Sequence, residues 1–345
     1  MHNSLEEKLI QLYKTFSGST ATEIIPLPVS GSHRKYFRIH GDSKSLIGAF
    51  NADTKENKAF ITFAKHFHNK GLNVPEIYLT DMDECIYLQE DLGDLTLFDF
   101  LDMEREGESV PSNVISYYKD ALSTLLKFQI DAGRDLDYSV CYPRGKFDEQ
   151  SIMWDLNYFK YYFLKLTGIS FDEQLLEDDF TALARYLSNA ESEFFMYRDF
   201  QSRNIMIKDG QLYFIDFQGG RKGALPYDVI SLLWSARANL SYELRTNLLE
   251  HYRKELVKYS GGYIDDFDKY YNGFLLIRIL QTLGAYGYRG YIENKKHFLE
   301  SIPFGINNLK WLLDNKVSEI KVECRELFNI LAEIVESGFK IEVKR

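Results

Sequence analysis

Three polar residues with oxygen-bearing side chains stand close together in the stretch MYRDFQSRNIMIKDGQLYFIDFQ, residues 196–218. Asp199 lies five positions before Asn204, and Asp216 follows Asn204 by twelve. The apolar runs at 205–207 and 212–215 flank the sequence Lys-Asp-Gly-Gln, a pattern that predicts a β-hairpin. Such a hairpin carries the three polar groups toward one end. Two carboxylates and one carboxamide would form a site of oxygen ligands, which suits Mg²⁺ bound together with nucleotide phosphates.

The order Asp-x-x-x-x-Asn, then a strand, then Ile-Asp-Phe resembles the catalytic and metal-binding loops of protein-kinase-like phosphotransferases. The match is to the branch of aminoglycoside phosphotransferases and choline kinases. More narrowly, RDFQSRN followed by YFIDFQGGRKGALPYDVISLLW is similar to the bacterial cell-wall amino-sugar kinases, which phosphorylate the anomeric hydroxyl of N-acetylmuramate or N-acetylglucosamine. This resemblance implies that Asp199 receives the acceptor hydroxyl, and that Asn204 and Asp216 hold Mg²⁺.

A chance Asx-rich turn is the simpler explanation of the first spacing when it stands alone. Here the hairpin, the Ile-Asp-Phe sequence and the Pro-Tyr-Asp sequence at 226–228 follow in the order that the family requires. We therefore favour the kinase-like interpretation. One departure is Tyr197, which occupies a position where the family commonly has His.

The length of the chain, 345 residues, exceeds that of one ordinary core, so two lobes are expected. The resemblance implies an α+β, protein-kinase-like fold. It has a small N-terminal nucleotide-binding lobe with an antiparallel sheet, at 1–92, and a larger, mainly helical lobe at 93–345 that carries the catalytic loop and the acceptor site. Strands are expected at 23–28, 36–40, 45–50, 76–80 and 85–90. Helices are expected at 4–16, 54–69, 95–102, 114–130, 148–166, 226–238, 241–259, 265–285, 295–315 and 317–336.

The loop at 29–34, between the first two strands, is the candidate phosphate loop. Gly31 lacks a Cβ, which lets backbone N–H groups approach phosphate oxygens, and Ser32 lies beside it. A plain hairpin turn is the alternative for a single glycine. The strand at 46–50 has no lysine where protein kinases keep the one that grips the phosphates, so Arg34 or Lys35 is the expected replacement.

The segment Gln-Glu-Asp-Leu-Gly at 89–93 resembles the hinge between lobes in the aminoglycoside phosphotransferase branch. Backbone groups near Glu90 and Asp91 are expected to hydrogen-bond adenine, because an extended strand that leaves a sheet presents N–H and C=O groups. The implied cofactors are ATP and Mg²⁺.

The acceptor site is less well defined by the sequence. Asp155 and the aromatic residues around it lie in a region that approaches the acceptor in related sugar kinases, although core packing is the simpler reading. The stretch at 278–303 also resembles the amino-sugar kinases. Within it Tyr286, Tyr288 and Arg289 are candidates to border the acceptor, with packing against the catalytic loop as the alternative.

Composition limits the other possibilities. No apolar run reaches the ~20 residues of a membrane span, and the N-terminus is too charged for a signal peptide, so we expect a cytoplasmic protein without membrane contact. The three cysteines show no metal-ligand spacing. A net charge of -10 disfavours a nucleic-acid-binding surface. The tail GFKIEVKR looks like the start of a strand, which would fit a fragment of a longer protein.

Together these features predict a small-molecule kinase that transfers the γ-phosphoryl group of ATP to a hydroxyl of a sugar or amino sugar. An aminoglycoside or choline-type kinase is the alternative within enzymes. A nucleotide-binding scaffold with weak catalysis is the alternative from another class, and the missing strand lysine favours it.

Overall fold

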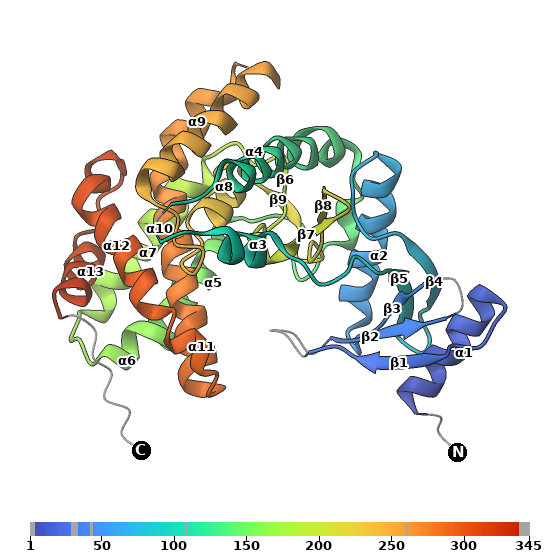
Figure 1. The fold of residues 1–345 in the computed structure, drawn as a ribbon. Coiled ribbons are helices and arrows are strands. Elements are labelled where there is room, and N and C mark those ends of the chain that lie inside the picture. Colours follow the sequence, from blue (N-terminus) through green and yellow to red (C-terminus); the bar gives the residue numbers. More distant parts are fainter. Residues whose placement is uncertain (1–3, 29–33, 42–43, 108, 260, 338–345) are drawn as a thin grey trace. The chain divides into compact units, whose positions relative to one another are not determined.

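The computed structural model describes residues 4–28, 34–41, 44–107, 109–259 and 261–337 (Figure 1). The chain forms two compact units. The first comprises residues 1–105, 110–145 and 202–220, and the second comprises 106–109, 146–201 and 221–345. The two units are defined by the contacts within each of them. The expected division into lobes at 1–92 and 93–345 is a division by function, and it stays a prediction.

The first unit contains a five-stranded antiparallel sheet, as expected, in the order β1-β2-β3-β5-β4. Its strands are β1 (Glu23–Pro26), β2 (Lys35–His40), β3 (Leu46–Phe50), β4 (Ile77–Asp81) and β5 (Ile86–Glu90). Residues of α1 (Leu5–Ser17) and of the sheet share one apolar core. Gly48 of β3 permits this contact, because a Cβ there would lie 2.9 Å from the side chain of Ile39 and 3.0 Å from that of Leu9.

Local sequence signals fix the helix ends of this unit. Helix α1 begins with a capping box of Ser4 and Glu7. Helix α2 (Thr54–Asn69) begins at the expected Thr, but its cap is Asp53, whose carboxylate accepts two backbone N–H groups. Thr96 caps α3 (Leu97–Glu104) in a second capping box.

The remainder of the first unit supports the predicted hairpin. Helix α4 (Ser112–Leu126) continues into a π-helical turn, Lys127–Ala132, and two 3₁₀ turns follow, Gly133–Asp135 and Tyr138–Val140. Strands β7 (Ile205–Lys208) and β8 (Gln211–Phe214) pair in antiparallel fashion after a 3₁₀ turn, Ser202–Asn204. Asp209 and Gly210 both have positive φ, 51° and 73°, as an Asp-Gly hairpin turn requires.

The second unit is mainly helical. Its elements are α5 (Glu149–Phe159), a π-helical turn Lys160–Leu164, α6 (Lys165–Thr167), α7 (Glu173–Ser188), β6 (Phe194–Met196), β9 (Arg221–Gly223), α8 (Pro226–Leu233), α9 (Tyr242–Tyr259), α10 (Tyr263–Gly287), a π-helical turn Tyr288–Ile292, α11 (Lys296–Leu299), α12 (Ile302–Asn315), a 3₁₀ turn Val317–Glu319 and α13 (Arg325–Glu336). Strands β6 and β9 pair in antiparallel fashion.

Helix α10 is the centre of the second unit and packs against α5, α8 and α12. Gly287 sets the distance between α10 and the π-helical turn after α5, since a Cβ there would lie 1.8 Å from the Tyr162 carbonyl oxygen. Helix α10 ends at Gly287, and the π-helical turn Tyr288–Ile292 follows it directly.

The two expected helices nearest the C-terminus are divided in the structure. The run at 295–315 forms α11 and α12, and Pro303 lies in the first turn of α12, where a missing N–H is tolerated. The run at 317–336 begins with the 3₁₀ turn Val317–Glu319, and its α-helix, α13, begins only at Arg325. The tail at 338–345 lies outside the described residues.

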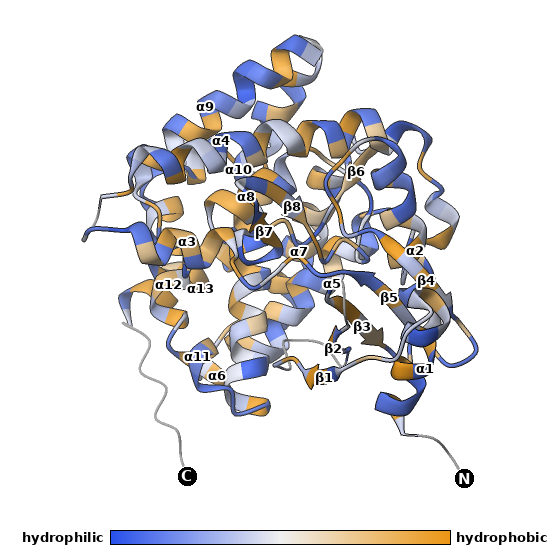
Figure 2. Ribbon diagram, turned by 45° about the vertical axis from the view of Figure 1, so that its right-hand side comes forward, coloured by the Kyte–Doolittle hydropathy of each residue, from blue (hydrophilic) through white to orange (hydrophobic). Residues whose placement is uncertain are grey.

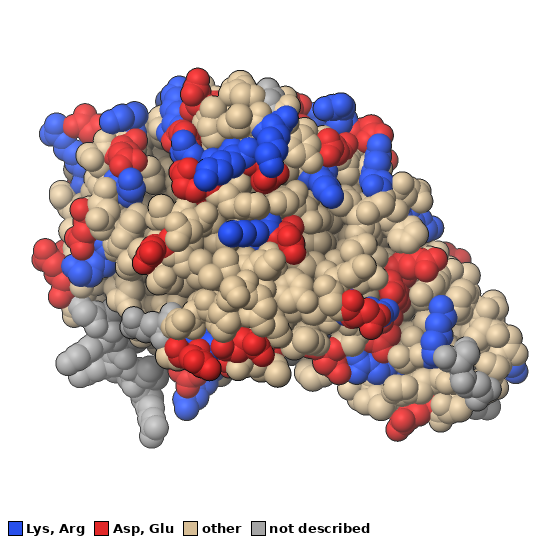
Figure 3. All heavy atoms as spheres, turned by 45° about the horizontal axis from the view of Figure 1, so that its top comes forward, with Lys and Arg blue, Asp and Glu red and all other residues tan. Residues whose placement is uncertain are grey.

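Hydropathy follows burial in these elements. Figure 2 shows hydrophobic residues on β3, whereas hydrophobic and hydrophilic residues alternate along α9. On the face drawn in Figure 3, basic and acidic side chains are intermingled. No helix among the described residues is long and apolar enough to cross a membrane.

Candidate functional site

The β7–β8 hairpin brings Asn204 and Asp216 together, as the sequence predicted. Asn204 directly precedes β7, and Asp216 follows β8 by two residues. The Ile215 N–H donates to the Asn204 carbonyl at 3.0 Å, and Asn204 Nδ2 donates to Asp216 Oδ2 at 3.1 Å. Asp216 has a φ of 70°, an unfavourable value for a residue with a Cβ. Such strain is found most often at functional sites.

Gln218 is a neighbour of this pair that the sequence analysis did not single out. Its Nε2 donates to Asp216 Oδ1 at 2.7 Å. Its Oε1 is buried and has no hydrogen-bond partner among the residues that the structure describes. Carboxylate and carboxamide oxygens are the ligands that Mg²⁺ prefers, and an unsatisfied buried oxygen beside them is suited to a cation or its bound water. The residues present therefore fit a magnesium ion.

Arg34 forms an ion pair with a glutamate of α2. Its Nη2 lies 3.0 Å from Glu56 Oε1, and Asn51 Nδ2 donates to the other oxygen of the same carboxylate at 2.9 Å. The Arg34 side chain is only 1% exposed and its guanidinium lies 5.3 Å from the centre of the Phe60 ring. A cation–glutamate pair thus exists, although the cation comes from the residue before β2 and not from β3. Gly31 and Ser32 lie outside the described residues.

Tyr36 is a neighbour of this ion pair. Arg34 Nη1 donates to the Tyr36 hydroxyl at 3.4 Å. Burial raises the pKa of Tyr36, the Arg34 guanidinium lowers it, and the nearby carboxylates of Asp216 and Glu56 raise it further. The half-buried Tyr36 side chain therefore lies within electrostatic range of both acids.

Glu90 and Asp91 use their side chains within the first unit. Glu90 accepts from Lys208 Nζ at 2.6 Å, and Asp91 forms an ion pair with Arg38 at 2.8 Å. Their backbones are also engaged, since the Glu90 N–H donates to the carbonyl of Glu76 and the Asp91 carbonyl accepts from Lys208. Strand β5 pairs with β3 and β4 and ends at Glu90, so Asp91 lies where the chain leaves the sheet. Adenine binding at these residues stays a prediction.

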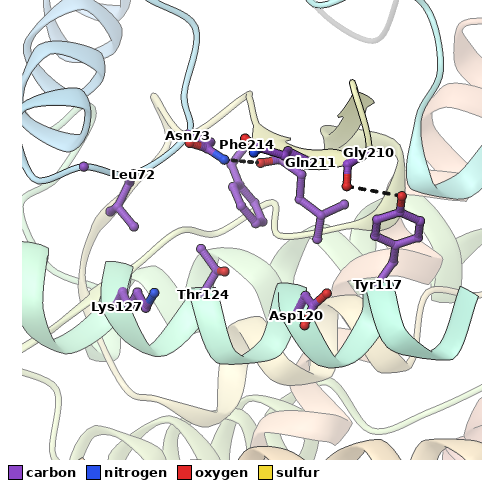
Figure 4. Close-up of a pocket in the computed structure, with 11 residues that line it drawn as sticks. Leu72, Asn73, Tyr117, Asp120, Thr124, Lys127, Gly210, Gln211 and Phe214 are labelled. Atoms are coloured by element: carbon purple, nitrogen blue, oxygen red, sulfur yellow. Dashed lines mark hydrogen bonds between the residues drawn. The ribbon is translucent and has the colours of Figure 1, made fainter. Parts of the chain in front are cut away.

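A groove of about 290 Å³ lies at the turn end of the hairpin. Polar side chains of α4 point toward the hairpin (Figure 4), and the hydroxyl of one of them, Tyr117, donates to the Gly210 carbonyl at 3.3 Å. From outside α4, Asn73 Nδ2 donates to the Leu212 carbonyl at 3.1 Å. Asn204 and Asp216 occupy the opposite end of the hairpin. This groove is therefore separate from the metal-binding candidates.

Asp199 belongs to the second unit, in the loop after β6. Its side chain is 46% exposed. Asp228 of α8, which is fully buried, stabilises this loop. Its carboxylate accepts hydrogen bonds from the backbone N–H groups of Tyr197, at 2.7 Å, and Arg198, at 2.9 Å. Burial raises the pKa of Asp228 to about 7, although the two N–H donors act to lower it. Tyr197 is itself fully buried, so the residue in the family's His position packs in the core.

Arg198 holds the same loop from the side. It forms two hydrogen bonds with Asp155 of α5, at 2.9 and 2.6 Å, and its guanidinium lies 4.9 Å from the ring centres of both Phe147 and Tyr227. Arg198 has a φ of 79°, so these contacts stabilise a strained residue next to Asp199. Asp155 thus supports the loop that carries Asp199, a role that spacing alone could not reveal.

The other acceptor candidates are also engaged within the second unit. Tyr288 packs against the rings of Tyr158 and Tyr162, with centres 6.1 and 4.9 Å apart. Arg289 forms an ion pair with Glu293 at 3.0 Å. Their contact with an acceptor stays a prediction.

The chain was compared with proteins of known family, activity or structure. Residues 23–263 match the model of the phosphotransferase enzyme family. The N-acetylmuramate/N-acetylglucosamine kinase of Neisseria meningitidis is 25% identical over 320 residues, which cover 89% of this chain and 90% of that protein. The Pseudomonas aeruginosa protein of the same name is 27% identical over 214 residues, which cover 61% of this chain and 59% of that protein.

Among solved structures, a spectinomycin phosphotransferase in complex with ADP and spectinomycin superposes with a TM-score of 0.55. Its identity is 11%, and the match covers 87% of this chain and 93% of that chain. Such a likeness shows a shared fold, which confirms the protein-kinase-like architecture expected from the sequence. With the family model matching more than half of its residues, this chain belongs to the phosphotransferase enzyme family and is a small-molecule kinase.

Proposed function

We propose that this enzyme uses Mg²⁺ and ATP to phosphorylate a hydroxyl group of an N-acetylated amino sugar, with the anomeric hydroxyl as the first candidate. The observation that carries the proposal is the pairing of Asn204 with Asp216 at one end of the hairpin, in a chain where Asp199 stands five residues earlier. The names of the relatives from Neisseria and Pseudomonas support the choice of acceptor.

In the proposed reaction, the acceptor oxygen forms a bond to the γ-phosphorus of ATP while the bond from that phosphorus to the β,γ-bridging oxygen breaks, and ADP leaves. Asp199 accepts the hydrogen bond of the acceptor hydroxyl and then its proton, which passes on to solvent. Asp199 thereby orients the nucleophile, and orientation supplies much of the rate enhancement in such reactions.

Asn204 and Asp216 would hold Mg²⁺, with Gln218 beside them. When bound, the metal neutralises charge on the phosphate oxygens. Asn204 Nδ2 donates to Asp216 in the structure, so the amide oxygen, Oδ1, is the atom of Asn204 that would bind the cation.

Nucleotide binding in this proposal involves the segments around Gly31, Ser32, Glu90 and Asp91, and the buried Arg34. Because Arg34 is paired with Glu56 and almost fully buried, we propose that it fixes the start of β2, immediately after the candidate phosphate loop. This arrangement provides an answer to the missing strand lysine, and it weighs against a scaffold without catalysis.

The test is ADP release by the purified protein with MgATP across N-acetylmuramate, N-acetylglucosamine, several aminoglycosides and choline. We expect turnover with the N-acetylated sugars, and product NMR then identifies the phosphorylated hydroxyl. Asp199→Asn and Asp216→Ala should lower kcat by about 100-fold or more, as expected when a proton acceptor or metal ligand is lost. Asp314→Ala, a control at a 56% exposed aspartate of α12, should leave the rate unchanged.

Each other outcome has a definite meaning. Turnover confined to aminoglycosides or choline would replace the acceptor and keep the kinase mechanism. Asp216→Ala with the parental rate would show that the metal assignment is wrong.

A further inference from the structure

Arg278 of α10 is a buried cation of the second unit, and it is 7% exposed. Its Nε donates to Ser231 Oγ at 2.9 Å, and its Nη1 donates to Gln281 Oε1. Its guanidinium lies 5.6 Å from the centre of the Tyr227 ring. Three neighbours therefore hold the planar group in one orientation.

The remaining end of this guanidinium faces the predicted proton acceptor. Arg278 Nη2 lies 3.9 Å from Asp199 Oδ1, and the side chains are 8% and 46% exposed. This distance is too long for a hydrogen bond but close enough for a strong charge interaction. The carboxylate is thus flanked by a fixed cation on its buried side while nearly half of its surface remains accessible.

The position of Arg278 in the helix is unusual for a charged residue. It interrupts the run FLLIRIL at 274–280, in which every residue is buried. A guanidinium in such surroundings costs free energy unless carboxylates lie nearby to offset the cost. Asp199 is one such group, since its Oδ1 lies 3.9 Å from Arg278 Nη2. The charge of Arg278 within this buried apolar run therefore calls for an explanation.

We propose that Arg278 is a positioning residue for phosphoryl transfer. It holds the Asp199 carboxylate in the orientation that accepts the acceptor hydroxyl, and it places a fixed positive charge beside the oxygen that attacks phosphorus. The inference rests on the proposed function of Asp199 as proton acceptor. A rigid guanidinium suits this task because it pays no reorganisation cost when charge develops in the transition state.

The kinetic test compares Arg278→Ala and Arg278→Lys with the parent enzyme. Arg278→Ala should lower kcat about 10- to 100-fold, the range expected when one fixed electrostatic group is removed. KM for ATP should stay within about 2-fold, because the residue acts on the chemical step and not on nucleotide binding. The kcat of Arg278→Lys should lie between those of the parent and Arg278→Ala, since one ammonium group cannot reach Ser231 and Asp199 together. Added guanidinium ion should partly restore the rate of Arg278→Ala.

Arg245→Ala is the matched control. Arg245 is equally buried, at 4% exposed, lies 4.4 Å from the centre of the Trp234 ring and donates to Asn308 at 2.8 Å. Its loss should lower stability without lowering kcat, and guanidinium ion should have no effect on its rate. If Arg278→Ala does not fold, Ser231→Ala tests the same idea by removing one anchor of the guanidinium, with an expected loss of about 5-fold in kcat.

A structural arm makes the inference independent of the acceptor. In crystal structures, the Asp199 carboxylate should be ordered in the parent and displaced in Arg278→Lys. An unchanged Asp199 position, or folded Arg278 variants with kcat within about 2-fold of the parent, would overturn the inference. A parent enzyme that turned over none of the acceptors would instead contradict the proposed function, and the crystal structures would still decide the role of Arg278.

Discussion

The buried carboxylate of Asp228 should make the stability of this protein depend on pH in an unusual direction. Its pKa is raised from 3.8 to about 7, mainly by burial. Between these two values the folded chain binds a proton that the unfolded chain does not. The free energy of unfolding therefore falls as pH rises through this window, and the contribution of protonated Asp228 is lost above about 7. The difference between the two pKa values corresponds to about 4 kcal/mol.

Asp228→Asn isolates this effect, because asparagine cannot titrate. It retains one carbonyl oxygen, so only one of the N–H groups of Tyr197 and Arg198 keeps its acceptor. The substitution should cost about 1–3 kcal/mol for the N–H group left unsatisfied. Urea unfolding of parent and variant over the range from pH 4 to 8 measures the difference in their free energies of unfolding. Other titrating groups cancel in this difference.

We expect the parent to gain about 4 kcal/mol relative to Asp228→Asn as pH falls across the window. A flat difference would mean that Asp228 stays ionised in the folded protein, so that its two N–H donors outweigh burial. A difference with the opposite slope would mean that the folded state prefers the charged form even more strongly than the unfolded state does.

Three further predictions follow from single contacts. Glu56→Gln removes the charge that pairs with buried Arg34 at 3.0 Å, and it should raise KM for ATP several-fold in steady-state kinetics. Activation of the variant by Mg²⁺ should be retained, because Asp216 is unchanged. Asp155→Asn leaves the buried Arg198 guanidinium without its paired charge, and should lower the free energy of unfolding by about 3–5 kcal/mol in urea titration, with a matching loss of kcat. Gly287→Ala places a Cβ 1.8 Å from a backbone carbonyl oxygen, and should lower the free energy of unfolding by about 3 kcal/mol or more.

Local signals in the sequence determined the elements that carry the candidate site. Alternation of apolar and polar residues around Asp-Gly predicted the β7–β8 hairpin, because that dipeptide accepts the two positive φ values of a tight turn. The hairpin alone was enough to place Asn204 beside Asp216. The five-strand sheet and its helices could be located in the same way, since each depends on periodicity and capping residues within a few positions.

Contacts between distant parts of the chain were decided only by tertiary packing. Arg34 meets Glu56 across 22 positions, Arg198 meets Asp155 across 43, and the two residues that hold the loop around Asp199 come from α5 and α8. Arg278 lies 79 positions after Asp199, at the start of the stretch that resembles the amino-sugar kinases, but it was not among the predicted site residues. Such pairs depend on how helices pack, and packing is set by many weak contacts that no short stretch of sequence contains. The sequence thus indicated the candidate groups for the chemistry, and the tertiary structure decided which charged residues contact them.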